Sequence, residues 1–300
     1  MPRARPSPRH RRRSRLVTTL PYPYESVQRY VLTAKLHSYL LDHTAAIRVL
    51  SEGIEQHPDA PHLYRHRGEF LLTILRLDEA LADCARAEAL LADHDDEIDF
   101  YQAQLAPEIE ALLLGRSLSL LHAPTPVTRE TIARWRDAYK SGLKASNAYH
   151  DALASYLSGD VARAAERFAD AHRLAISDDT RSAATNWRYL SLRRSGAAGD
   201  AQRILEEAPD TFATNEGSYA FLIDVYRGRL SDDAIAARVA AMPHRARVTC
   251  SYGHGAWLAL EGREEEAVGV LRGTLALGDA TAFGHLAARV DLERMGGGGV

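Results

Sequence analysis

Hydrophobic positions between residues 146 and 175 recur at helical spacing and predict two helices joined by a tight turn. In the first helix, Tyr149 and Tyr156 lie two turns apart and therefore share one face. Gly159 supplies the permissive backbone of the turn, and Asp160 is a favourable cap for the second helix. The second helix places on one face Ala164, Ala165, Phe168, Ala171 and Leu174. One such hairpin leaves apolar surface uncovered, so the pattern predicts neighbouring hairpins of the same design.

The order of a small residue, a bulky residue, a Gly-Asp turn, Ala, Phe and Ala resembles a tetratricopeptide repeat. The resemblance implies an all-α fold in which helix hairpins with a 34-residue period stack into a right-handed α-solenoid. The segments 27–60 and 61–94 follow this register without a gap. They carry small residues at family positions, namely Ala34, Ala46, Gly53, Gly68, Ala80 and Ala87.

The pattern divides the chain into six parts. These are a disordered Arg- and Pro-rich leader (1–24), two repeats (25–94), a degenerate helical hairpin with an enlarged loop (95–144), four repeat-like hairpins (145–279), a C-terminal capping helix (280–295) and a glycine tail (296–300). Pro61 is expected to open a first helix, where its missing N–H does no harm. Asp78 and Ser231 are expected to cap two of the second helices.

Residues 95–144 depart from the repeat pattern and form the insertion. We expect one helix from about Glu97 to Leu114, a loop, and another helix from about Arg129 to Gly142. The acidic cluster at 93–99 lacks the residue order of a calcium loop. We interpret its carboxylates as favourable charge at a helix N-terminus. Such an insertion either closes one end of a groove or forms a feature specific to a partner.

No motif in the chain supports an enzyme. His62 and His66 have a spacing that suits a metal, but no third ligand accompanies them, and we interpret both as surface histidines. The sequence has neither a Walker-type phosphate loop nor a Gly-x-Ser-x-Gly elbow. Cys84 and Cys250 lie far apart in helical stretches and are expected to be free buried thiols. We therefore expect no cofactor and no metal.

Charge is distributed unevenly along the chain. Residues 1–24 contain seven arginines and no acidic residue, which leaves the remainder with a net charge of about −10, given 37 basic and 40 acidic residues in all. The leader is most simply a solvated tail or the product of a misassigned start codon. A nucleic-acid contact through its arginines is an alternative, although the acidic body would repel phosphate. No apolar run of about 18 residues predicts a membrane span, and we expect a cytoplasmic protein.

The resemblance also implies a concave groove lined by the first helix of each hairpin. By register, the groove residues are Arg65, Glu69, Tyr149, Leu153, Tyr156, Asn186, Leu190, Arg193, Asn215, Tyr226 and Tyr252. Tyr and Arg often anchor protein interfaces, and Asn can bond an extended peptide backbone. An equal alternative for each residue is that it fills a gap between adjacent helices. The family's carboxylate clamp for chaperone C-termini is not reproduced, because Lys35 lacks its partners.

These observations predict a non-enzymatic scaffold or adaptor that binds a protein or peptide partner in its groove. One alternative is a nucleic-acid-associated protein that uses the leader. Another is a peptide-sensing regulator, although no helix-turn-helix pattern accompanies the repeats. A fainter likeness to the new lipoprotein I type of adaptor does not extend to its anchor, since no lipobox cysteine lies near the start.

Overall fold

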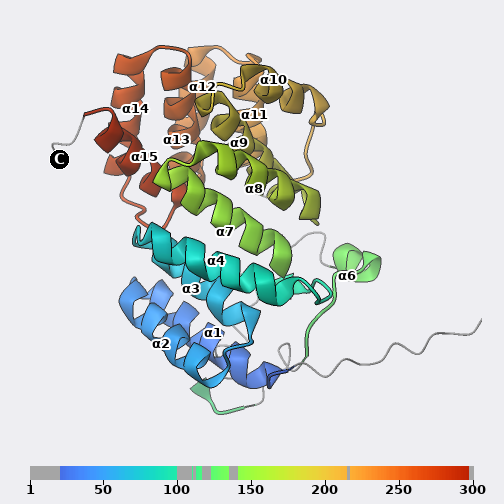
Figure 1. The fold of residues 1–300 in the computed structure, drawn as a ribbon. Helices are drawn as coiled ribbons and strands as arrows, with labels where there is room; N and C mark the ends of the chain where they lie inside the picture. Colours follow the sequence, from blue (N-terminus) through green and yellow to red (C-terminus); the bar gives the residue numbers. More distant parts are fainter. Residues whose placement is uncertain are drawn as a thin grey trace, which may run out of the picture.

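The computed structural model describes residues 21–99, 110, 113–116, 123–134, 141–214 and 217–296. Within these ranges the chain forms fourteen α-helices and one two-stranded sheet, which confirms the predicted all-α class. Neighbouring helices pack side by side in a row, from α1 and α2 at the bottom of the view to α10, α12 and α14 at the top (Figure 1). None of the helices in these ranges has both the length and the hydropathy that a bilayer span requires.

The first four helices form two hairpins. Their bounds are α1 Tyr24–Tyr39, α2 His43–Gln56, α3 Pro61–Thr73 and α4 Leu77–Leu91. Pro61 opens α3, as predicted. The predicted cap at Asp78 is wrong, because a tight turn in which the Arg76 N–H donates to the Leu71 carbonyl (2.9 Å) starts α4 at Leu77 and places Asp78 inside the first turn.

The packed chain also begins earlier than the predicted leader boundary. Tyr22 and Tyr24 are buried in the same cluster of apolar side chains as Val27 and Leu63. The expectation of disorder for residues 1–20 falls outside the described residues, as does most of the glycine tail.

The second half of the row begins at Leu143. Its helices are α7 Leu143–Ser158, α8 Val161–Leu174, α9 Asp178–Arg194, α10 Ala198–Glu207, α11 Ser218–Tyr226, α12 Asp232–Ala240, α13 His244–Leu260, α14 Glu264–Ala276 and α15 Phe283–Arg294. Two predicted caps are confirmed. The Asp160 carboxylate accepts the Arg163 N–H at 3.1 Å, and the Ser231 hydroxyl accepts the Ala234 N–H at 3.4 Å. Gly159 adopts the left-handed backbone (φ 100°) that ends α7.

The insertion differs from its prediction at both ends. Strand β1 (Ile98–Asp99) pairs antiparallel with β2 (Ser141–Gly142), so no helix starts at Glu97 and none ends at Gly142. Only α6 (Arg129–Arg134) represents the second predicted helix among the described residues, and residues 100–109 lie outside them. Local pattern fails here because pairing between segments more than 40 residues apart decides the backbone conformation.

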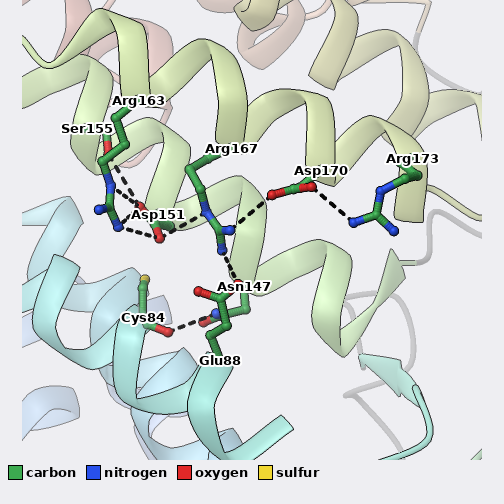
Figure 2. Close-up of polar contacts among 9 residues, drawn as sticks. All are labelled: Cys84, Glu88, Asn147, Asp151, Ser155, Arg163, Arg167, Asp170 and Arg173. Atoms are coloured by element: carbon green, nitrogen blue, oxygen red, sulfur yellow. Dashed lines mark hydrogen bonds and ion pairs between the residues drawn. The ribbon is translucent and has the colours of Figure 1, made fainter. Parts of the chain in front are cut away.

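Helix α4 packs directly against α7, so the row of helices continues across the insertion. Figure 2 shows the polar contacts at this junction, where Asp151 of α7 is fully buried. Its carboxylate forms ion pairs with Arg163 at 2.9 Å and with Arg167 at 3.2 Å, both from α8. Arg167 also reaches Glu88 of α4 at 2.9 Å. A buried carboxylate is tolerated only with such partners, so these contacts fix α4, α7 and α8 in one arrangement.

Cys84 and Cys250 are both buried and form no disulfide, as predicted. Cys84 lies at the junction, where its carbonyl accepts a hydrogen bond of 2.9 Å from the amide of Asn147 (Figure 2). Burial raises the pKa of the Cys84 thiol, with a smaller contribution from Asp151. The thiol is therefore protonated at neutral pH and packs as a small apolar group.

Candidate functional site

Most predicted groove residues of the second half lie inside its core. The hydroxyl groups of Tyr156 and Tyr252 are 2.7 Å apart, and Trp187 stacks on Tyr252 with ring centroids 5.3 Å apart. Leu153 and Leu190 are fully buried beside them. In this structure these side chains fill the space between adjacent helices, which favours the packing alternative for each of them.

Of four further predicted groove residues, three form hydrogen bonds within the chain and one lies outside the described residues. The Tyr226 hydroxyl donates to the side-chain oxygen of Asn186 at 2.8 Å. Arg193 donates to the Leu260 carbonyl at 3.1 Å. This carbonyl lies at the C-terminus of α13, where the helix dipole stabilises a cation. Asn215 lies outside the described residues.

Helix α15 returns to α7, which explains why this half offers little open surface at the predicted positions. The Arg294 guanidinium donates to the Leu157 carbonyl at 2.6 Å, near the end of α7. The Phe283 ring lies 6.3 Å from the half-buried Tyr149 ring and 5.7 Å from the His150 ring. The last helix of the row therefore covers side chains of the first helix of this half.

The two predicted groove residues of α3 belong to a different environment, a buried charge cluster formed by Lys35, Arg65, His66, Glu69, Asp99 and His150. Arg65 is only 2% exposed. Its guanidinium forms an ion pair with Asp99 at 2.7 Å and a second ion pair with Glu69. Lys35 of α1 reaches Glu69 at 3.8 Å, and His66 reaches Asp99 at 3.5 Å. Helices α1, α3 and α7 and strand β1 therefore meet at these charges.

His62 and Glu97 form a second buried pair beside the charge cluster. The imidazole of His62 contacts the Glu97 carboxylate, and the rings of Tyr22 and Tyr24 lie edge-on to the imidazole, with centroids 6.1 Å and 5.4 Å away. The prediction that His62 and His66 are surface histidines is wrong, since both are buried. The segment around β1 carries the carboxylates that cover this face of α3.

A small set of backbone hydrogen bonds holds that segment extended. The Ile98 N–H donates to the Thr125 carbonyl at 2.7 Å, and the Leu143 N–H donates to the Glu97 carbonyl at 2.7 Å. The Asp96 carboxylate accepts the Lys144 N–H at 3.0 Å, which caps α7. Alternation along the strand places Glu97 and Asp99 on the same side, so both carboxylates meet α3.

The predicted helix-capping role of the acidic cluster is therefore correct for one residue, on a different helix, and wrong for two others. Asp96 does cap a helix, but that helix is α7, some 47 residues further along the chain. Glu97 and Asp99 instead pair with His62 and Arg65. The capping interpretation is wrong for these two residues because they lie in or beside β1, where no helix begins.

Burial and charge together set the protonation states in the cluster. Burial alone raises the pKa of Asp99, but Arg65 and His66 outweigh it and hold this pKa well below its usual range. Burial likewise opposes ionisation of Glu69, and Lys35 and Arg65 lower its pKa well below the usual value. Burial and Arg65 lower the pKa of His66, and they lower that of His150 to about 4. At neutral pH the cluster holds two carboxylates, two cations and two neutral histidines.

This arrangement suits recognition of carboxylates. Its donors are a guanidinium, an ammonium and imidazoles, and guanidinium–carboxylate bonds are among the strongest in proteins. Among the described residues, no group of three or more His, Cys, Asp or Glu side chains is placed to hold a metal ion. The perturbed pKa values mark this cluster as the candidate site.

The repeat register identified part of this site and missed the rest. It selected Arg65 and Glu69, and in the same register Lys35 occupies the position of Glu69 one repeat earlier, while His62 lies one turn before Arg65. The available signal for the missed carboxylates was the spacing of Glu97 and Asp99, two residues apart in a run of acidic residues. The sequence was compared with protein-family models and with curated proteins, and neither comparison gives a match.

Proposed function

We propose that the protein is a non-enzymatic scaffold for protein–protein interaction, built as a tetratricopeptide-like right-handed solenoid. Its binding face is the face of α1, α3 and α7 that carries the charge cluster. One observation carries this proposal. An extended segment of the chain itself, residues 96–99, lies on that face with its carboxylates bound by α3. A face that holds one extended segment has the shape and the donors to hold another.

Two further features support a binding role for this face. Its charged side chains come from successive first helices, with Lys35 on α1 and Arg65 on α3, as expected for a surface built by repeats. The side chains of Lys35 and Glu69 are 13% and 23% exposed, so the cluster reaches the surface of the described chain at these two residues. Helix α15 covers Tyr149 and His150 of α7, which leaves the part of this face on α1 and α3 as the better candidate for a partner.

Selection from a random peptide library tests this function. The library is selected on the intact chain and on an Asp99→Asn variant, and enriched peptides are measured by fluorescence anisotropy. We expect Lys35→Ala to weaken binding at least tenfold, while Arg203→Ala, which removes one cation from an exposed pair with Asp200 on α10, leaves it unchanged. If Lys35→Ala and Arg203→Ala bind the peptides equally well, the binding site does not lie on this face. The absence of any enriched peptide on either protein would contradict the proposed scaffold.

A further inference from the structure

The segment that occupies the binding face also points to the chemistry of its partner. We propose that residues 96–99 are a built-in occupant of this face and that they give way to a partner segment that is extended and acidic, with two carboxylates two residues apart. This inference rests on the proposed function, since it names the partner of the same site.

The contacts of Glu97 and Asp99 define the two positions that such a segment would fill. Glu97 lies against His62, and Asp99 lies against Arg65 and His66. Both positions are buried, so an occupant must complement donors that water does not reach. A neutral or basic side chain opposite Arg65 would leave the buried guanidinium without the negative charge that Asp99 now supplies, and breaking a buried ion pair is strongly destabilising. The second position in particular therefore selects a carboxylate.

The helical row does not depend on the insertion for its continuity. Helix α4 packs directly against α7, so the insertion can leave the face while the row stays intact. Without Asp99, the carboxylate of Glu69 remains between the two cations Arg65 and Lys35. Departure of the internal segment therefore leaves one positive charge in excess, which favours its replacement by an acidic segment.

The insertion itself supplies most of the backbone bonds of residues 96–98. Ile98 bonds Thr125, and the Val127 N–H donates to the Asp96 carbonyl at 3.0 Å. The link to the helical row is made chiefly by the side chains of Glu97 and Asp99 and by the N-terminus of α7. Residues 96–98 and 125–127 are thus bonded to each other and dock on α3 together. Its tethering gives it a high effective concentration, which weakens the apparent affinity for any partner in solution.

A synthetic peptide with the sequence of residues 94–99, labelled with a fluorophore, is the probe. Its binding is compared between the intact chain, Asp99→Asn, and the control Asp95→Asn, which makes the same change of charge at an exposed position in the same segment. We expect Asp99→Asn to bind the probe at least tenfold more tightly than the other two proteins, which corresponds to about 1.4 kcal/mol. A probe with Gln in place of its Glu (position 97) and Asn in place of its last Asp (position 99) is expected not to bind.

A second measurement avoids any variant. Amide hydrogen exchange is followed on the intact chain with saturating probe. We expect Leu143 to exchange faster, because its acceptor, the Glu97 carbonyl, leaves with the internal segment. If circular dichroism shows that Asp99→Asn does not fold, Glu97→Gln replaces it with the same expectation.

The outcomes separate this inference from the proposed function. Equal probe affinity for Asp99→Asn and Asp95→Asn, with unchanged exchange at Leu143, would overturn the inference. If the library then yields neutral or basic peptides that need Lys35, the scaffold stands and only the acidic partner is wrong. If no peptide of any kind binds, both proposals fail.

Discussion

Tyr156 of α7 and Tyr252 of α13, 96 residues apart in the chain, share a hydrogen bond of 2.7 Å in the core of the second half. Tyr252 also donates to the Asp291 carboxylate of α15 at 3.0 Å, and Arg194 of α9 pairs with the same carboxylate. One buried polar network therefore joins four helices that are distant in sequence. Such a network specifies how these helices close on one another, because each member is costly to leave unpaired.

Tyr252→Phe tests the worth of this network. The substitution keeps the ring but removes the hydroxyl that contacts Tyr156 and Asp291, so we expect the free energy of unfolding to fall by about 1–3 kcal/mol. Urea denaturation followed by circular dichroism measures this change. The control is Tyr64→Phe, whose hydroxyl donates to the Pro58 carbonyl at the surface, and we expect a change of less than about 0.5 kcal/mol. Similar losses for both variants would show that the buried network adds nothing.

Asp151→Asn tests the junction between the two halves of the row. Asn keeps the shape of the side chain but removes the charge that receives Arg163 and Arg167, so we expect a loss of about 1.5–3 kcal/mol. The matched change Asp200→Asn breaks an exposed ion pair on α10 and is expected to cost less than about 1 kcal/mol. Thermal or urea unfolding distinguishes the two. Equal costs would mean that the buried carboxylate does not fix α4, α7 and α8.

The hairpins and several of their ends were predictable because they depend on residues close in the sequence. Helical spacing gave α7 and α8, and Asp160 capped its own helix as predicted. The prediction of a cap at Asp78 was wrong because a backbone hydrogen bond to α3 sets the turn before α4. The strand at Ile98 and the burial of His62 failed for a stronger reason. Both arise from contacts across 30 residues or more, to which local periodicity carries no information.

The same limit applies to the candidate site. A register drawn from one helix face places Arg65 and Glu69 together, because residues four apart on a helix are neighbours. It does not show that Asp99 closes over them or that α15 covers Tyr149. The first depends on the pairing of β1 with β2, and the second depends on how far the row of helices curves back on itself; a single repeat determines neither.

Two glycines in the second half are expected to respond to alanine with opposite signs. A Cβ at Gly284 would lie 3.1 Å from the Val248 carbonyl oxygen and 3.3 Å from the Thr249 Cα, backbone atoms that cannot move aside without shifting α13. We expect Gly284→Ala to cost about 1–3 kcal/mol. Gly273 lies inside α14 with nothing near its added Cβ, so Gly273→Ala is expected to stabilise by about 0.5–1 kcal/mol. Unfolding midpoints that shift in the same direction would contradict the close approach of α15 to α13.

Stability is expected to fall as the pH drops below about 6.5, and His150 provides the clearest test. Its pKa is lowered to about 4 by burial and by Arg65, so the folded protein keeps it neutral where the unfolded chain binds a proton. Protonation of His150 therefore stabilises the unfolded state between pH 6.5 and 4. His150 alone lowers the free energy of unfolding by roughly 3 kcal/mol over that range. Glu69 and Asp99, whose pKa values are lowered, add a further loss as the pH falls through the carboxylate range, since the unfolded chain then takes up protons that the folded chain refuses. Urea titrations between pH 7 and 4 measure the slope, and His150→Gln, whose amide can still donate to the Ser146 carbonyl, is expected to flatten it. An unchanged slope in that variant would show that His150 does not titrate between the two states.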